Sequence, residues 1–192
     1  MPLRIYAETN LPTGLGMMRF RTYRDDAINE PLAVMSGSLD TSRPINLRIH
    51  SSCITSEVFA SCKCDCKQQL DYALKYISQH SGLVIYLQQE GRGVGLGDKI
   101  RAYALQEQGY DTIEANEMLN LPIDARSYRH AIEILQGLKI TSVNLLTNNP
   151  EKINALENAG IKVSARIPVL IPTSSHSAAY LATKRIKMGH LL

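Results

Sequence analysis

The run Leu83-Val84-Ile85-Tyr86-Leu87, followed by Glu90-Gly91-Arg92-Gly93-Val94-Gly95, predicts a buried strand that leads through a tight loop into a helix. A continuous apolar run of this length is typical of a strand that is covered on both faces. The helix is expected from about Asp98 to Gln108, because Gly109 is a common residue at a helix end. A glycine-rich loop between a strand and a helix exposes backbone N–H groups, which favours binding of an anion, although this spacing matches neither the dinucleotide fingerprint nor a P-loop.

The rest of the chain alternates strands and helices in the same way. Strands are expected at residues 17–23, 33–37, 45–50 and 143–146, and helices at residues 67–80, 127–135 and 150–160. Residues 10–15 are expected to form a turn and residues 115–124 a loop. In the 45–50 strand, apolar and polar residues alternate, which predicts one face of each kind. The recurring strand-to-helix units predict an α/β fold, a mixed β-sheet flanked by helices, in a single domain that spans residues 1–192.

The composition of this 192-residue chain argues against several classes of protein. Its formal net charge of +3 is scattered and forms no basic stripe, so nucleic-acid binding is not expected. No apolar run approaches membrane-spanning length, so no membrane association is expected. The N-terminus, Met1-Pro2-Leu3-Arg4-Ile5, lacks the apolar segment of a secretory signal. We therefore expect a soluble protein in the reducing environment of the cytoplasm.

Three of the four cysteines, Cys53, Cys64 and Cys66, have a spacing that suits a metal ion. A Cys-x-Cys pair is too short to close a disulfide without strain, but its thiolates can share a tetrahedral Zn²⁺. Three protein ligands leave one position for water, which is the pattern of a catalytic zinc. Cys62 leaves an alternative open, since Cys62, Cys64 and Cys66 would share one face of an extended segment and could form a closed structural site of four thiolates.

Charged and aromatic residues near these motifs are candidates for ligand binding. Arg92 can contact a phosphate in a bidentate manner, whereas the Glu90 carboxylate suits the N–H donors of a guanine edge. A solvated glutamate beside a glycine turn is the simpler interpretation of Glu90. His50 is a candidate fourth metal ligand, although a lone histidine at such a position more often supports a ligand. Tyr103 is either a core residue or a residue that reaches a substrate with its hydroxyl.

Two further segments have both a structural and a functional interpretation. Thr147 and Lys152 flank Asn149 and Pro150, a good N-cap and a good first helical residue, so a plain helix start with a surface lysine is preferred over a phosphate site. The pattern Asp124-Ala125-Arg126 is explained most simply by a local salt bridge. An arginine nucleophile would need a neighbouring base, because its pKa is above about 12.

Together these motifs resemble the GTP cyclohydrolase II family. The resemblance is carried by Arg48-Ile49-His50-Ser51-Ser52-Cys53, Cys64-Asp65-Cys66, Gln89-Glu90-Gly91-Arg92-Gly93-Val94-Gly95-Leu96, Lys99-Ile100-Arg101-Ala102-Tyr103-Ala104-Leu105-Gln106, Gly109-Tyr110-Asp111-Thr112, Leu146-Thr147-Asn148-Asn149-Pro150 and Lys187-Met188-Gly189-His190-Leu191-Leu192. These motifs occur in the family order, from about residue 10 to the end of the chain, and are jointly very specific. The resemblance implies a GTP cyclohydrolase II-like fold.

The resemblance also implies a role for each matching residue. Cys53, Cys64 and Cys66 match the zinc ligands, with water as the fourth ligand. Asp124 matches a proton acceptor, and Arg126 matches a residue proposed to attack the α-phosphorus or to stabilise charge there. Tyr103 matches a tyrosine near the base. Positions that bind GTP in the family are matched by Arg48, Ile49, His50, Ser51, Ser52, Gln69, Glu90, Gly91, Arg92, Thr112, Thr147 and Lys152.

The activity implied by the resemblance is the zinc-dependent hydrolysis of GTP by a homodimer, with one Zn²⁺ per chain and Mg²⁺ on the triphosphate. The imidazole ring opens, formate and pyrophosphate leave, and the product is 2,5-diamino-6-(5-phosphoribosylamino)pyrimidin-4-one, the first intermediate of riboflavin synthesis. The alternative is a non-catalytic GTP-binding protein whose zinc is held by all four cysteines.

Several positions depart from the family pattern, and none of them is one of the three cysteines that match the zinc ligands. Ser52 stands in place of Glu, Ser56-Glu57 in place of Gly-Asp, Lys67 in place of Gly, and Ala125 and Ser127 in place of acidic residues. We interpret these changes as drift or as the mark of a paralogue in a specialised pathway. The tail, residues 183–192, is basic and then apolar, and we expect it to dock or to dimerise.

Overall fold

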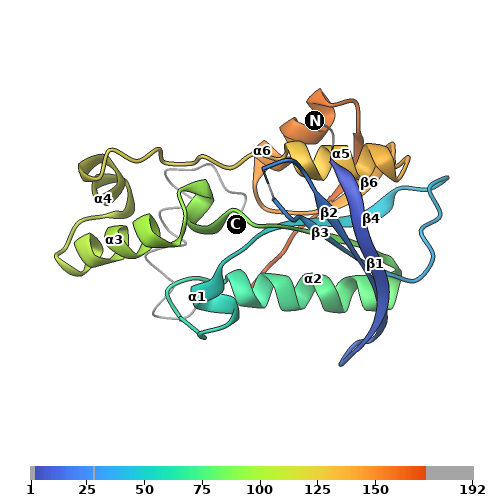
Figure 1. Cartoon of the computed structure of the whole chain (residues 1–192), viewed down its shortest axis with the longest axis horizontal. Helices are drawn as coiled ribbons and strands as arrows, with labels where there is room; N and C mark the ends of the chain where they lie inside the picture. The colour runs from blue at the N-terminus through green and yellow to red at the C-terminus, as the bar shows by residue number, and fades with distance from the viewer. Residues whose placement is uncertain (1–2, 28, 172–192) are drawn as a thin grey trace.

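The computed structural model describes residues 3–27 and 29–171, which form a mixed seven-stranded sheet with helices on both faces (Figure 1). The strands are β1 (Arg4–Thr13), β2 (Gly16–Arg24), β3 (Leu32–Ser36), β4 (Ile45–Ser51), β5 (Gly82–Leu87), β6 (Ser142–Leu146) and β7 (Lys162–Ile167). The helices are α1 (Ile54–Glu57), α2 (Cys66–His80), α3 (Leu96–Glu107), α4 (Thr112–Met118), α5 (Arg129–Gly137) and α6 (Pro150–Asn158), with a 3-10 turn, η1 (Glu90–Gly93). The predicted α/β class with a mixed, helix-flanked sheet is confirmed.

The sheet changes from antiparallel to parallel pairing at β5. Its order is β1-β2-β3-β5-β4-β6-β7, and the pairs from β1 to β5 are antiparallel, whereas β5, β4, β6 and β7 run parallel to one another. Parallel strands end at the same edge of a sheet, and ligands bind at that edge in open α/β folds. The segments that follow β4, β5 and β6 therefore meet, and these are the segments that carry the sequence motifs.

The run 83–87 is apolar throughout because both of its faces are covered. Val84 belongs to a cluster with Ala73 of α2, while Ile85 belongs to a second cluster on the opposite face with Ile134 of α5. Figure 1 shows α2 on one side of the sheet and α5 and α6 on the other. Burial of each large apolar side chain contributes about 1.5–3 kcal/mol, so the two clusters hold the layers together.

Helices α3 and α4 stand away from the sheet, beyond the ends of the parallel strands (Figure 1). Helix α3 packs against α4 and η1. A capping box starts α4, since the Asp111 carboxylate accepts hydrogen bonds from the backbone of the first turn and the Glu114 carboxylate accepts one from the Asp111 N–H. The loop predicted for residues 115–124 is therefore wrong over its first part, where the capping box makes the chain helical.

The edge strands β1 and β7 were not predicted from the sequence. Nearly every residue of β1 is exposed, so this strand lacks the apolar alternation that marks a half-buried strand. The predicted turn at 10–15 is confirmed only at Gly14 and Leu15, because β1 continues to Thr13. The tail 183–192, which was expected to dock or to dimerise, lies outside the described residues.

The polar face predicted for the 45–50 strand exists, but two of its three side chains are buried and only Asn46 is partly exposed. Arg48 and His50 on β4 are only 5% and 2% exposed. They lie at the carboxyl end of the strand, beneath the loops that follow β5 and β6. Among residues 3–27 and 29–171, no helix is long and apolar enough to span a membrane.

Candidate active site

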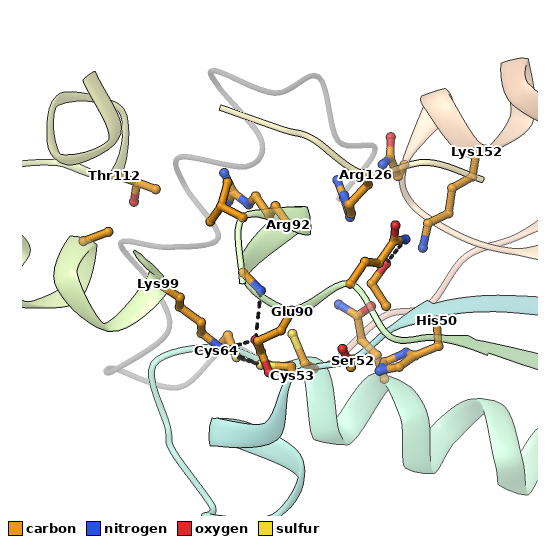
Figure 2. Close-up of a pocket in the computed structure, with 18 of the residues that line it drawn as sticks. His50, Ser52, Cys53, Cys64, Glu90, Arg92, Lys99, Thr112, Arg126 and Lys152 are labelled. Atoms are coloured by element: carbon orange, nitrogen blue, oxygen red, sulfur yellow. Dashed lines mark hydrogen bonds and ion pairs between the residues drawn. The ribbon is translucent and has the colours of Figure 1, made fainter. Parts of the chain in front are cut away.

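A pocket opens where β4, β5 and β6 end, between the sheet on one side and α3 and α4 on the other (Figure 2). Among the predicted site residues, Ile49 and Asp124 do not line it. Those that do are Arg48, His50, Ser51, Ser52, Cys53, Cys64, Cys66, Gln69, Glu90, Gly91, Arg92, Tyr103, Thr112, Arg126, Thr147 and Lys152. Ile49 is a core residue with no exposed surface, and Asp124 pairs with Arg126, which does line the pocket. Residues that lie far apart in the sequence thus meet in one pocket.

The sulfur atoms of Cys53, Cys64 and Cys66 all lie within 4.8 Å of one another. The Cys53 and Cys64 sulfurs are 3.6 Å apart. Cys62 is exposed, and its thiol faces the carbonyl of Ala60 at 3.7 Å. The cluster therefore consists of three cysteines, and the structure gives the four-cysteine alternative no support.

This donor set fits a tetrahedral zinc ion. Zn–S bonds of about 2.3 Å place two thiolate ligands about 3.8 Å apart, which is close to the separation of the Cys53 and Cys64 sulfurs. Contacts with the other two thiols, followed by the Lys99 ammonium, hold the pKa of Cys53 far below its ordinary value, whereas the contact with Cys53 raises the pKa of Cys64. His50 is not part of the cluster, so its candidacy as a fourth ligand is not supported.

Lys99 and Glu90 form a buried ion pair beside the cysteines. The Lys99 ammonium lies 2.7 Å from Glu90 Oε1, 2.8 Å from Thr55 Oγ1 and 3.2 Å from the Cys53 sulfur. Glu90 Oε1 also accepts a hydrogen bond from the N–H of Gly91, and Oε2 accepts one from the N–H of Ile54 at 2.6 Å. Each carboxylate oxygen has two acceptor positions, so only Oε2 keeps one for a ligand donor.

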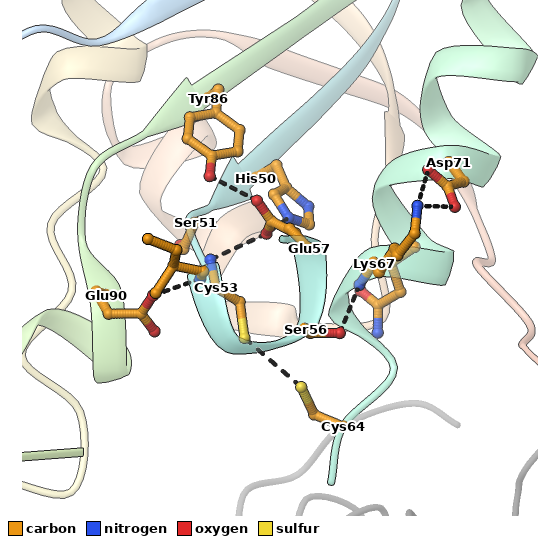
Figure 3. A network of polar contacts seen from close by, with 12 residues as sticks. His50, Ser51, Cys53, Ser56, Glu57, Cys64, Lys67, Asp71, Tyr86 and Glu90 are labelled. Carbon is orange, nitrogen blue, oxygen red and sulfur yellow. Dashed lines mark hydrogen bonds and ion pairs between the residues drawn. The ribbon is translucent and has the colours of Figure 1, made fainter. Parts of the chain in front are cut away.

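Glu57 organises a second network, on the far side of Cys53 (Figure 3). Its Oε1 accepts from the Cys53 N–H and faces His50 Nε2, each at 2.9 Å, and its Oε2 accepts from the Tyr86 hydroxyl at 2.6 Å. His50 and Tyr86 are paired across β4 and β5, which stacks their rings. Burial lowers the pKa of His50 to about 4, so its imidazole is neutral near pH 7 and donates its Nε2 proton to Glu57.

The wall of the pocket that lies across from the cysteines carries positive charge (Figure 2). Arg48 donates to the carbonyl of Leu146 and to Gln69, while the Lys152 ammonium donates to the carbonyl of Ile49 at 2.7 Å. Burial lowers the pKa of Arg48 only to about 10, so this side chain stays charged near neutral pH. Lys152 is only 4% exposed, so the surface lysine preferred from the sequence is wrong.

Asp124 and Arg126 form the local salt bridge that the sequence predicted. Arg126 Nε and Nη2 both donate to the Asp124 carboxylate, in a bidentate arrangement. Burial acts to raise the pKa of Asp124, but the hydrogen bonds and charge of Arg126 outweigh it, and the pKa lies below its ordinary value. Asp124 is therefore a carboxylate near pH 7, and its main contact is to the arginine that lines the pocket.

One face of helix α3 lines the pocket, and of this face only Tyr103 was predicted as a site residue from the sequence. Lys99, Ala102, Tyr103 and Gln106 all line the pocket, at the i, i+3, i+4 and i+7 positions of one helix face. Asn116 of α4 lines it too and is only 8% exposed. The sequence did contain a signal for this face. Lys99 lies four residues before Tyr103 and Gln106 three residues after it, and this helical spacing predicts that all three side chains face the same way.

Comparisons with known proteins show which proteins this chain is similar to. The family model "GTP cyclohydrolase II" matches residues 4–168. The chain is 44% identical to GTP cyclohydrolase-2 of Picrophilus torridus, over 98% of this chain and 99% of that one. It is 43% identical to riboflavin biosynthesis protein RibBA of Staphylococcus saprophyticus, over 97% of this chain but only 47% of that protein.

A solved structure of RibBX, a two-domain 3,4-dihydroxy-2-butanone 4-phosphate synthase from A. baumannii, matches with a TM-score of 0.49 and 16% identity, over 90% of this chain and 41% of that one. The family model spans most of the chain, from β1 to the end of β7, and includes the cysteine cluster, the glycine-rich loop and the Asp-x-Arg pair. The chain therefore belongs to the GTP cyclohydrolase II family of enzymes.

Proposed function

We propose that this enzyme hydrolyses GTP, opening the imidazole ring of guanine and releasing formate and pyrophosphate to give 2,5-diamino-6-(5-phosphoribosylamino)pyrimidin-4-one, an intermediate of riboflavin synthesis. One observation carries the proposal. A single pocket holds a three-cysteine metal cluster at one end and a wall of buried cations at the other. A nucleoside triphosphate has a base and a polyanion at its two ends, so it complements such a pocket.

The metal end of the pocket receives the base. Cys53, Cys64 and Cys66 would hold Zn²⁺, which supplies Lewis-acid chemistry and lowers the pKa of a coordinated water to near neutrality. Glu90 has one acceptor position left on Oε2, which suits a single N–H donor of guanine. Tyr103 lines the same end, with the centre of its ring 5.7 Å from the Lys99 ammonium.

The cationic end receives the triphosphate. Arg48, Arg126 and Lys152 supply positive charge there, and Thr147 offers a hydroxyl. Mg²⁺ would accompany the triphosphate and screen its charge. We propose that Arg126 stabilises the charge that develops at the α-phosphorus, since a guanidinium held by Asp124 in a bidentate pair is oriented as a cation. We also propose that the enzyme is a homodimer.

Product analysis tests the proposal directly. The zinc-loaded protein is incubated with GTP and Mg²⁺, and the products are identified by mass spectrometry. Formate, pyrophosphate and the diaminopyrimidine phosphate are expected together. A retained formamide or a retained triphosphate would mean that the reaction stops early and would contradict the product proposed here. Unchanged GTP with a folded, metal-replete protein would refute the activity and favour a binding protein.

A further inference from the structure

Lys99 uses its whole hydrogen-bonding capacity on the metal site. An ammonium has three N–H donors, and the Lys99 ammonium has three acceptors within reach: the Cys53 sulfur, Thr55 Oγ1 and Glu90 Oε1. The side chain is 9% exposed, and Figure 2 shows it reaching from α3 toward Cys53 and Glu90. None of the functional roles assigned above uses this residue.

The charges around Lys99 explain why a buried cation is tolerated there. Three thiolates and the Glu90 carboxylate carry four negative charges, and a divalent metal ion leaves two of them uncompensated. Lys99 compensates one of these two charges. The ammonium lies 2.7 Å from Glu90 Oε1, and this ion pair offsets the burial of the lysine charge.

The contacts of Lys99 also join three segments of the pocket. Lys99 itself lies in α3. Its ammonium pairs with Glu90 of the glycine-rich loop and donates hydrogen bonds to Cys53 and Thr55 in the segment after β4. Glu90 reinforces this link, because its other oxygen accepts from the N–H of Ile54. Lys99 and Glu90 together therefore hold the three segments to one another.

We propose that Lys99 is a positioning residue that fixes Cys53 and Glu90 in one geometry and tunes the metal through the Cys53 sulfur. This inference rests on the proposed function, in which the three cysteines hold the metal. A hydrogen bond from an ammonium withdraws electron density from a thiolate, so the sulfur donates less charge to the ion. A metal ion that receives less electron density from its ligands is a stronger Lewis acid. Mutation of a residue that hydrogen-bonds to a metal ligand commonly lowers metal affinity or activity by about 10–100-fold.

A spectroscopic comparison of two variants tests the inference. The wild-type enzyme, Lys99→Met and Lys99→Arg are each loaded with Co²⁺, and the sulfur-to-cobalt charge-transfer band is recorded in the near ultraviolet. Loss of the N–H donor should move the band of Lys99→Met to longer wavelength. Lys99→Arg, which keeps a charged donor, should return the band toward the wild-type position. An unchanged band in Lys99→Met would overturn the proposal.

Kinetics and a matched control complete the test. In the zinc enzyme, Lys99→Met should lower kcat for GTP by about 10–100-fold, with a smaller change in KM. Arg101→Met removes a cation from the same helix, where Arg101 is 62% exposed and pairs with Asp98, and it should leave the band and kcat unchanged. If Lys99→Met fails to hold metal, Lys99→Gln replaces it, because its amide keeps an N–H donor without the charge. The charge-transfer band of Lys99→Gln should lie between that of the wild type and that of a thiolate with no donor. A band identical to that of the wild type would overturn the proposal.

The two proposals can fail separately. A wild-type enzyme that shows the cobalt–thiolate band but no turnover of GTP would refute the proposed function and leave the role of Lys99 standing. A wild-type enzyme that turns over GTP, with a Lys99→Met variant unchanged in both band and kcat, would refute the role of Lys99 alone.

Discussion

Glu57 accepts a hydrogen bond from the backbone N–H of Cys53, with 2.9 Å between the oxygen and the nitrogen. Cys53 is the N-cap of α1 and has no side-chain cap of its own, so the carboxylate four residues later closes this turn. Glu57 is in turn held by the Tyr86 hydroxyl and by His50. The backbone of Cys53, the first cysteine of the cluster, is thus tied to two neighbouring strands of the sheet.

Glu57→Gln should weaken metal binding without removing any sulfur ligand. The amide keeps the shape of the side chain, but its NH₂ group cannot accept a hydrogen bond, so at least one of its three donors loses its acceptor. We expect metal affinity to fall by about 10–100-fold and the free energy of unfolding by about 1–3 kcal/mol. Competition with a chromophoric chelator measures the affinity. The exposed Glu107→Gln is the control, and equal affinities in the two variants would contradict the prediction.

The stability of the protein should decrease as the pH falls from about 6.5 to about 4, in part because of His50. Burial lowers its pKa in the folded state to about 4, against an ordinary value of 6.5. Between these values the unfolded chain binds a proton that the folded protein does not, so protonation favours unfolding. The contribution of His50 to the free energy of unfolding amounts to about 3 kcal/mol. It is fully present above pH 6.5 and is lost as the pH falls toward 4.

Urea unfolding at a series of pH values measures this effect. Other groups titrate in the same range, so the informative quantity is the difference in pH slope between the wild type and His50→Gln, under the same metal conditions. The variant should show the shallower slope, since glutamine does not titrate. Parallel slopes would mean that His50 is protonated as easily in the folded protein as in the unfolded chain.

The sequence predicted the elements that are buried and missed those that are exposed. The run 83–87 could be recognised because both of its faces pack against helices, which makes it apolar throughout. Strand β1 could not, because it is exposed along nearly its whole length and is defined by pairing with β2. Helix α4 was missed although its capping residues, Asp111 and Glu114, are visible in the sequence.

The candidate site was predicted residue by residue, but the links between its residues were not. The cysteine spacing and the Asp-x-Arg pair are local patterns, and such patterns can be interpreted without a structure. The contact between Lys99 and Cys53 joins positions 46 residues apart, and the one between Tyr86 and Glu57 joins positions 29 apart. Contacts of this kind depend on the sheet order, in which β4 lies between β5 and β6, and no local pattern encodes that order.

Cys62→Ser should leave metal binding intact. The Cys62 side chain is exposed and lies outside the cluster of the other three sulfurs, so its loss removes no ligand. Cys64→Ser removes a buried sulfur from the cluster and should abolish stoichiometric binding. Metal content per chain, measured after dialysis, distinguishes the two variants. Loss of metal from Cys62→Ser would mean that the ion is held by four thiolates, as in a structural site.

Gly93→Ala should damage the site by displacing the segment that carries Arg126. Gly93 has a φ angle of +90°, and a Cβ atom there would lie 2.8 Å from the backbone carbonyl of Ala125. The two segments are already joined, since the Ala125 N–H donates to the carbonyl of Arg92 at 2.9 Å. A shift of about 1 Å in a catalytic group can cost about 10²-fold in rate, so we expect kcat to fall at least tenfold.

Gly97→Ala separates this displacement from a general effect of replacing glycine. Gly97 lies in α3 and lines no part of the pocket, and a Cβ atom added there would have no neighbouring atom within 4 Å. Alanine there restricts the unfolded chain and fits the helix, so the free energy of unfolding should rise by about 0.4–1 kcal/mol with kcat unchanged. Steady-state kinetics and urea unfolding of both variants check the pair. A Gly93→Ala enzyme with the kcat of the wild type would show that the Asp124–Arg126 segment can move without consequence, and the role proposed for Arg126 would then be wrong.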